Sequence, residues 1–108
     1  MEIHNKLIRD RIAEIIKSNG EIPEVEVLDD ADYAKKLDEK LLEECGELFA
    51  ADNKDSIIEE MADILEVIYA KADLLGIVID EIEKVRLEKR EKRGAFKEKL
   101  FLKSVRQF

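Results

Sequence analysis

Residues 41–51 read LLEECGELFAA and residues 57–67 read IIEEMADILEV, so one helical pattern occurs twice, sixteen positions apart. Apolar residues fill the same places in both copies, at intervals of three and four. This spacing predicts two amphipathic helices, each with one buried face. The acidic positions of the two copies also align in pairs: Glu43 with Glu59, Glu44 with Glu60, and Glu47 with Asp63.

Only a short segment, residues 52–55, separates the two predicted helices. Asp29 or Asp30 is the expected N-cap of the first helix, and Ser56 with Glu59 fits a capping box for the second. We therefore predict core helices near 30–52 and 56–75. Helices joined by so short a connection normally lie antiparallel.

Four acids lie beside the predicted buried faces of this helix pair. Counted outward from the loop, Glu47 falls near the level of Glu60, and Glu44 falls near the level of Asp63. Their convergence is unfavourable, because like charges four residues apart cost about 0.2–0.5 kcal/mol per pair. Nearby cations are scarce: Lys40 stands four residues before Glu44.

Hard divalent ions prefer oxygen ligands, and Mg²⁺ is usually held by a few carboxylates. A bound cation would therefore offset the repulsion among these acids. The alternative is that the acids are solvated helix faces, since the chain contains 27 Asp and Glu residues. The repeat favours a cation site, because matched core and acid positions on two joined helices are hard to obtain from composition alone.

The remaining sequence predicts an all-α fold, a helical bundle of about four helices. Asn5 can cap a first helix that ends near Ser18, and a fourth helix is expected from about Ile79 to Arg93. Two segments suit extended backbone, and we predict a short two-stranded pairing between them: residues 21–28 and residues 96–105.

Length and composition predict a single domain covering residues 1–108. The many apolar helix faces of so small a chain predict a homodimer or homotetramer. The net charge of −8 argues against general nucleic-acid binding, which depends mainly on lysine and arginine. A single cysteine and the absence of an apolar leader predict a cytoplasmic protein without membrane insertion.

The acidic motifs also resemble a known family. EExxE at residues 43–47, twelve intervening residues and ExxD at residues 60–63 are typical of the MazG-like all-α nucleoside triphosphate pyrophosphohydrolases. HNKLIRDRIAEII at residues 4–16 is similar to the "YNKLVRDKIPEII" branch of this superfamily, which is related to phosphoribosyl-ATP pyrophosphohydrolase. KRGAF at residues 92–96 is similar to that branch as well. Three positions depart from the branch pattern: His4, Ala13 and Ala95.

The resemblance implies Mg²⁺-dependent cleavage of an NTP or dNTP between its α- and β-phosphates, giving a monophosphate and pyrophosphate. Mn²⁺ is an alternative ion, and nucleotide-pool housekeeping is an expected role. The implied metal ligands are Glu44, Glu47, Glu60 and Asp63. Glu43 or Glu59 would orient or deprotonate the attacking water. Substrate contacts are expected from residues in or beside the terminal motifs: Asn5, Lys6, Arg9, Lys89 and Arg93.

Two other functions fit the same sequence. The first is a narrow-specificity pyrophosphohydrolase of the phosphoribosyl-ATP type. The second is a non-catalytic helical module that binds a metal or nucleotide and regulates a partner. Turnover separates the enzyme from the module, whereas ligand binding alone does not.

Overall fold

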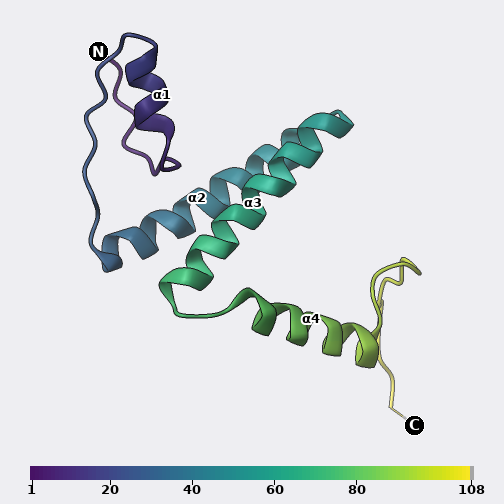
Figure 1. The fold of residues 1–108 in the computed structure, drawn as a ribbon. Helices are drawn as coiled ribbons and strands as arrows, with labels where there is room; N and C mark the ends of the chain where they lie inside the picture. Colours follow the sequence, from purple (N-terminus) through teal and green to yellow (C-terminus); the bar gives the residue numbers. More distant parts are fainter. Residues whose placement is uncertain (108) are drawn as a thin grey trace. The chain divides into compact units, whose positions relative to one another are not determined.

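The computed structural model describes residues 1–107 of the chain (Figure 1). These residues form four helices and no strand, which confirms the predicted all-α class. The helices, in chain order, are α1 (Ile12–Ser18), α2 (Asp30–Ala50), α3 (Lys54–Leu74) and α4 (Ile79–Arg93). The polypeptide forms two compact units, Met1–Ile77 and Val78–Phe108.

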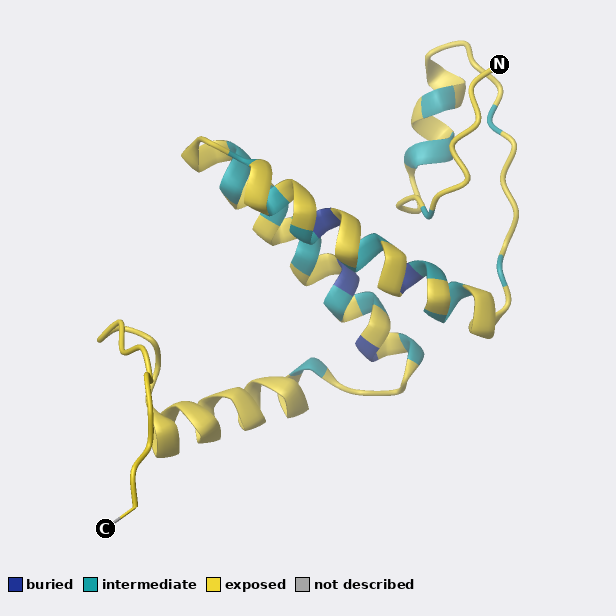
Figure 2. Ribbon diagram, turned by 180° about the vertical axis from the view of Figure 1, so that it is seen from behind, coloured by how far each residue is buried: buried dark blue, intermediate teal, exposed yellow. Residues whose placement is uncertain are grey.

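In the first unit, α2 and α3 run antiparallel and pack along their length, as the short connection predicted (Figure 1). The described core of this unit is small, and its buried apolar side chains are Leu37, Val67 and Ala72. They come from both helices (Figure 2). An ion pair between Lys71 and Asp38, with 2.7 Å between nitrogen and oxygen, also joins α3 to α2.

Side-chain caps explain where the two long helices begin. The Asp29 carboxylate accepts a 2.8 Å hydrogen bond from the backbone N–H of Asp32, so Asp29 is the N-cap of the two residues that the sequence allowed. The side chain of Asn53 accepts a 2.9 Å bond from the backbone N–H of Ser56. The predicted capping box at Ser56 is therefore wrong: α3 begins at Lys54, because the amide oxygen of Asn53 already satisfies a free N–H of the first turn.

The predicted start of the first helix at Asn5 is also wrong. Asn5 has a φ of 46°, in the left-handed region, whereas an N-cap needs extended backbone. Helix α1 starts at Ile12, and its end after Ser18 agrees with the prediction. Gly20, at φ 83°, donates to Lys17, and Glu21 donates to Ile16, which together close a Schellman motif.

The predicted strand pairing of residues 21–28 with residues 96–105 is wrong. Neither of these two described segments forms a strand. Residues 21–28 are irregular, and Pro23 within them has no N–H to donate to a ladder. The tail turns at residues 97–98, and Lys99 has a φ of 58°, so its backbone cannot follow a regular strand.

Helix α4 lies in the second unit and has the predicted bounds, with Val78 as N-cap residue and Gly94 after its end. Acids occupy its first turn and basic residues its last, an arrangement that complements the helix dipole. None of its residues is buried. Among the described residues, no helix is both long and apolar enough to cross a membrane.

Candidate metal centre

Three of the four predicted metal ligands come together on the α2–α3 pair. One carboxylate oxygen each of Glu44, Glu47 and Glu60 can be chosen so that all three lie within 4.8 Å of one another. Glu44 and Glu47 are neighbours because they lie three residues apart on one helix face. The antiparallel packing of α3 brings Glu60 to their level, which agrees with counting outward from the loop.

Glu44 is unusual because a carboxylate is buried in a unit with so small a core. Its exposed fraction is 4%. One oxygen of Glu44 (Oε2) and one of Glu60 (Oε2) are buried without a hydrogen-bond partner. A buried polar oxygen without a partner costs free energy, and the cost is larger for a charged group. Carboxylate oxygens grouped in this way are suitable ligands for a hard divalent cation. The residues present therefore suit Mg²⁺ or Mn²⁺.

The three acids perturb one another's ionisation. Partial burial and the neighbouring carboxyls of Glu44 and Glu47 together raise the pKa of Glu60 to about 7. Burial alone would also raise the pKa of Glu44, but hydrogen bonds with Lys40 and Glu60 and the charge of Lys40 lower it overall. Below about pH 7, Glu60 is therefore mostly protonated.

Lys40 provides the positive charge next to the buried carboxylate. Its Nζ lies 3.1 Å from Oε1 of Glu44 and 3.9 Å from Oε1 of Glu43. The side chain of Lys40 is itself only 23% exposed. The spacing of four residues in the sequence explains the contact with Glu44, because such residues are neighbours on one helix face.

Asp63, the fourth predicted ligand, makes a different contact. Nη2 of Arg9 donates a 2.7 Å hydrogen bond to Oδ1 of Asp63. This contact links the amino-terminal motif to α3 across 54 sequence positions. The structure therefore joins two residues that the sequence had assigned to separate roles, Asp63 as metal ligand and Arg9 as substrate contact.

A pocket of about 160 Å³ adjoins the carboxylate cluster. The amino-terminal segment forms one side and α2 forms the other. The lining residues are Asn5, Lys6, Leu7, Lys36, Glu39, Lys40 and Glu43. The pocket brings the predicted substrate residues Asn5 and Lys6 close to Glu43.

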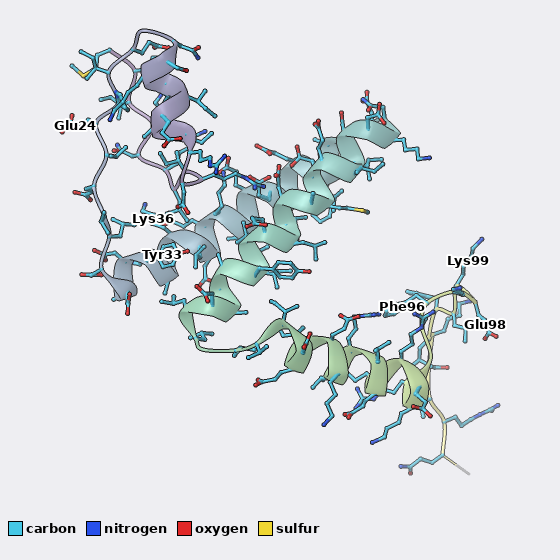
Figure 3. All side chains as sticks on the ribbon, viewed as in Figure 1. Glu24, Tyr33, Lys36, Phe96, Glu98 and Lys99 are labelled. Carbon is cyan, nitrogen blue, oxygen red and sulfur yellow. The ribbon has the colours of Figure 1, made fainter. Side chains whose placement is uncertain are left out.

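Sequence reasoning missed Lys36 and Glu39, which line this pocket. Lys36 projects from α2 and is labelled in Figure 3; its Nζ lies 3.0 Å from Oε2 of Glu39. The sequence feature that could have identified them is a shared helix face. Its members follow one another at intervals of three, one and three residues: Lys36, Glu39, Lys40 and Glu43. Nothing in the sequence, however, shows that the amino-terminal segment covers this face.

The remaining candidates are not members of the group of three acids. Glu59 is an exposed residue of α3. Lys89 and Arg93 belong to α4 in the second unit, where both are exposed, and their role in substrate binding stays a prediction.

Comparison with known proteins shows the family to which the chain belongs. The family model described as "Phosphoribosyl-ATP pyrophosphohydrolase" matches residues 6–91. The chain therefore belongs to the phosphoribosyl-ATP pyrophosphohydrolase family, within the MazG-like all-α superfamily. The match extends from the amino-terminal motif through both acidic motifs and most of α4.

One curated relative also matches the chain. It is an uncharacterized protein of Mycolicibacterium smegmatis (strain ATCC 700084 / mc(2)155), 46% identical over 54 residues. The aligned region covers 50% of this chain and 55% of the relative, so it spans about half the length of each. No solved structure matches the chain.

Proposed function

We propose that this protein is a divalent-metal-dependent pyrophosphohydrolase that cleaves an NTP or dNTP between the α- and β-phosphates. The products would be a nucleoside monophosphate and pyrophosphate, and the role would be housekeeping of the nucleotide pool. The observation that carries the proposal is buried Glu44, whose free oxygen lies in a cluster with Glu47 and Glu60. Family membership supports the reaction class.

Glu44, Glu47 and Glu60 would hold the ion, and Asp63 would join them by giving up its bond to Arg9. A bound Mg²⁺ or Mn²⁺ supplies charge neutralisation at phosphate and makes water a better nucleophile near neutral pH. Arg9 released from Asp63 would be free to donate to a substrate phosphate. Guanidinium groups suit this task because they bind phosphate oxygens through two donors at once.

Glu43 is the better of the two candidates for taking a proton from the attacking water. It lines the pocket beside Asn5 and Lys6, and its side chain is 42% exposed. It can therefore reach both solvent and a ligand in the pocket. Glu59, an exposed residue of α3, is the second candidate. Asn5 and Lys6 would position the phosphate chain.

A second candidate substrate is phosphoribosyl-ATP. The description of the matching family names this compound, and the match covers residues 6–91. The reaction is chemically the same, since phosphoribosyl-ATP also carries a triphosphate that is cut to release pyrophosphate. The two candidate substrates differ in the groups attached to the base. Competition between them for the enzyme therefore shows which one it prefers.

Pyrophosphate release tests the function. The assay would use ordinary, deoxy and damaged NTPs together with phosphoribosyl-ATP, with and without Mg²⁺, and Glu60→Gln as the variant. We expect metal-dependent release that the substitution abolishes while the circular dichroism spectrum is retained. Folded protein that binds Mg²⁺ and nucleotide without releasing pyrophosphate from any substrate would instead support the non-catalytic module.

We also propose that residues 1–108 act as one domain within a homodimer or homotetramer. The family match supports the single domain because it runs through both compact units. An exposed apolar stripe supports the assembly. On α3 it contains Ile58, Met61, Leu65 and Tyr69, each 43–54% exposed. Light scattering coupled to size-exclusion chromatography tests the assembly, and a monomer at micromolar concentration would contradict it.

A further inference from the structure

Lys40 belongs to two neighbouring features at once. Its ammonium contacts Glu44 of the carboxylate cluster, and its side chain lines the pocket formed by α2 and the amino-terminal segment. Among the described residues that line this pocket, Lys40 is the one that forms an ion pair with a member of the cluster. Lys40 is therefore the direct link between the cluster and the pocket.

We propose that the Lys40 ammonium couples the two features. With no divalent cation bound, its ammonium is the counter-ion of Glu44. When a divalent cation binds the cluster, the ammonium leaves Glu44, moves into the pocket and binds a phosphate group there, together with Lys6 and Lys36. This inference rests on the proposed function, because it uses the same carboxylates as the metal site.

The first argument is that Glu44 cannot serve two cations equally well. The ammonium nitrogen lies 3.1 Å from one oxygen of Glu44, a residue that is only 4% exposed. A divalent ion on the same carboxylate would lie within a few ångströms of this nitrogen. Water screens charges poorly at a buried position, so the repulsion between the two cations is stronger there than at an open surface.

The second argument is that Lys40 has somewhere to move. A lysine ammonium sits on a flexible four-carbon stem, so it can shift by several ångströms while its helix stays in place. The adjoining pocket of about 160 Å³ is already lined by part of the Lys40 side chain. This volume equals that of several water molecules at about 30 Å³ each, enough for one phosphate group.

The third argument concerns charge in the pocket. Its lining carries three lysines and two glutamates, and Lys36 already pairs with Glu39 at 3.0 Å. While the ammonium of Lys40 pairs with Glu44, its charge is directed toward the cluster. Once released, it gives the pocket a cation free to bind an anion. A phosphate in the pocket would in turn hold Lys40 away from Glu44, so by linkage phosphate and divalent cation promote each other's binding.

Calorimetric titration with Mg²⁺ alone tests the exchange. The variants are Lys40→Met, which keeps the length of the stem without its charge, and Lys36→Met as matched control. We expect Lys40→Met to bind Mg²⁺ roughly three- to tenfold more tightly than the natural protein, because the competing ammonium is gone. Lys36→Met should bind Mg²⁺ as the natural protein does, since Lys36 contacts Glu39 and not the cluster.

The second part of the titration uses inorganic pyrophosphate in saturating Mg²⁺. Here Lys40→Met should bind several-fold more weakly than the natural protein, so the substitution acts in opposite directions on cation and anion. A merely structural role would weaken both. Equal or weaker Mg²⁺ binding by Lys40→Met would overturn the inference while leaving the proposed metal site intact. No Mg²⁺ binding by the natural protein would overturn both.

A measurement on the natural protein decides the question if Lys40→Met does not fold. Lysines are acylated with an amine-reactive reagent with and without Mg²⁺, and mass spectrometry quantifies each site. Lys40 should become several-fold more reactive when Mg²⁺ is added. Lys71 is the control, because its Nζ pairs with Asp38 at 2.7 Å and not with an acid of the cluster. The reactivity of Lys71 should not change. Unchanged labelling of Lys40 in saturating Mg²⁺ would contradict the exchange.

Discussion

The α2–α3 hairpin and α4 are all highly charged, but they use their charges in different ways. Helix α4 buries no side chain, and its Glu83 pairs with Arg86 three residues later. The hairpin instead buries Glu44 and brings two more acids close to it from both helices. Charge density by itself thus makes a solvated helix. A candidate site arises where charges border an apolar stripe and a second helix packs on it.

The balance of charge follows the same division. Residues 1–77 contain 21 acidic and nine basic residues, whereas residues 78–108 contain ten basic and six acidic residues. The acids of the hairpin therefore have few lysines or arginines to pair with. A divalent cation would supply the missing positive charge in the first unit, and α4 needs none. Four predictions examine this difference, from the largest effect to the smallest.

The largest effect is expected from removing the charge of the buried acid. Glu44→Gln should lower pyrophosphate release at least about a hundredfold, because the variant loses a proposed ligand at the centre of the cluster. Glu91→Gln, on exposed α4, should stay near the natural rate. Steady-state assays in Mg²⁺ measure both. A Glu44→Gln variant with normal turnover would remove this cluster from the reaction.

The second largest effect is expected from side-chain packing, which differs between the α2–α3 hairpin and α4. Leu37 is 2% exposed on α2, and Leu87 is 49% exposed on α4. Leu37→Ala should lower the free energy of unfolding by about 2–5 kcal/mol, because it removes buried apolar atoms and leaves a cavity. Leu87→Ala should change it by no more than about 0.5 kcal/mol. Urea unfolding gives both values. A large loss for Leu87→Ala would show that another surface covers α4.

Stability of the metal-free protein should depend on pH through Glu60. Its pKa is raised from 4.5 to about 7 in the folded state, so the folded protein binds this proton more tightly than the unfolded chain does. The stabilising contribution is complete below pH 4.5 and is lost as the pH rises to about 7. The thermal midpoint in a chelator should therefore fall over this range, and Glu60→Gln should flatten the decrease.

Glu83 of α4 is the control for that experiment. The hydrogen bond from Arg86 lowers the pKa of Glu83. Any contribution of Glu83 to folding stability is therefore lost as the pH falls through this lowered pKa. Glu83→Gln should leave the decline between pH 4.5 and about 7 unchanged. If Glu83→Gln flattened the decline as much as Glu60→Gln, the cluster would not be its source.

Helix capping should give the smallest effects. The side chain of Asn53 caps α3, whereas Val78 gives α4 no side-chain cap. Asn53→Ala should lower the free energy of unfolding by about 1 kcal/mol. Val78→Asp should make α4 more helical, with a gain of at most about 1 kcal/mol. Amide hydrogen exchange measures each helix separately. For Val78→Asp, slower amide exchange in α4 without a change in α3 would support the new side-chain cap.

Much of the helical architecture could be predicted from local sequence. Apolar spacing located α2, α3 and α4, and glycines located the ends of α1 and α4, because both signals act between residues a few positions apart. Local reasoning was less reliable where several polar residues could cap the same turn. Asn53 caps α3 in place of the predicted Ser56, and Asn5 caps no helix.

The sequence by itself determined that two acidic helices pair antiparallel, because helical periodicity and a short loop suffice for this. It predicted that Glu44, Glu47, Glu60 and Asp63 converge, and the structure brings the first three of them together. Only the tertiary structure decided which of these acids is buried and which charges face them. The bond from Arg9 to Asp63 and the pocket beside Lys40 both depend on how the amino-terminal segment packs on the hairpin. Such contacts join residues far apart in the chain, and no local spacing encodes them.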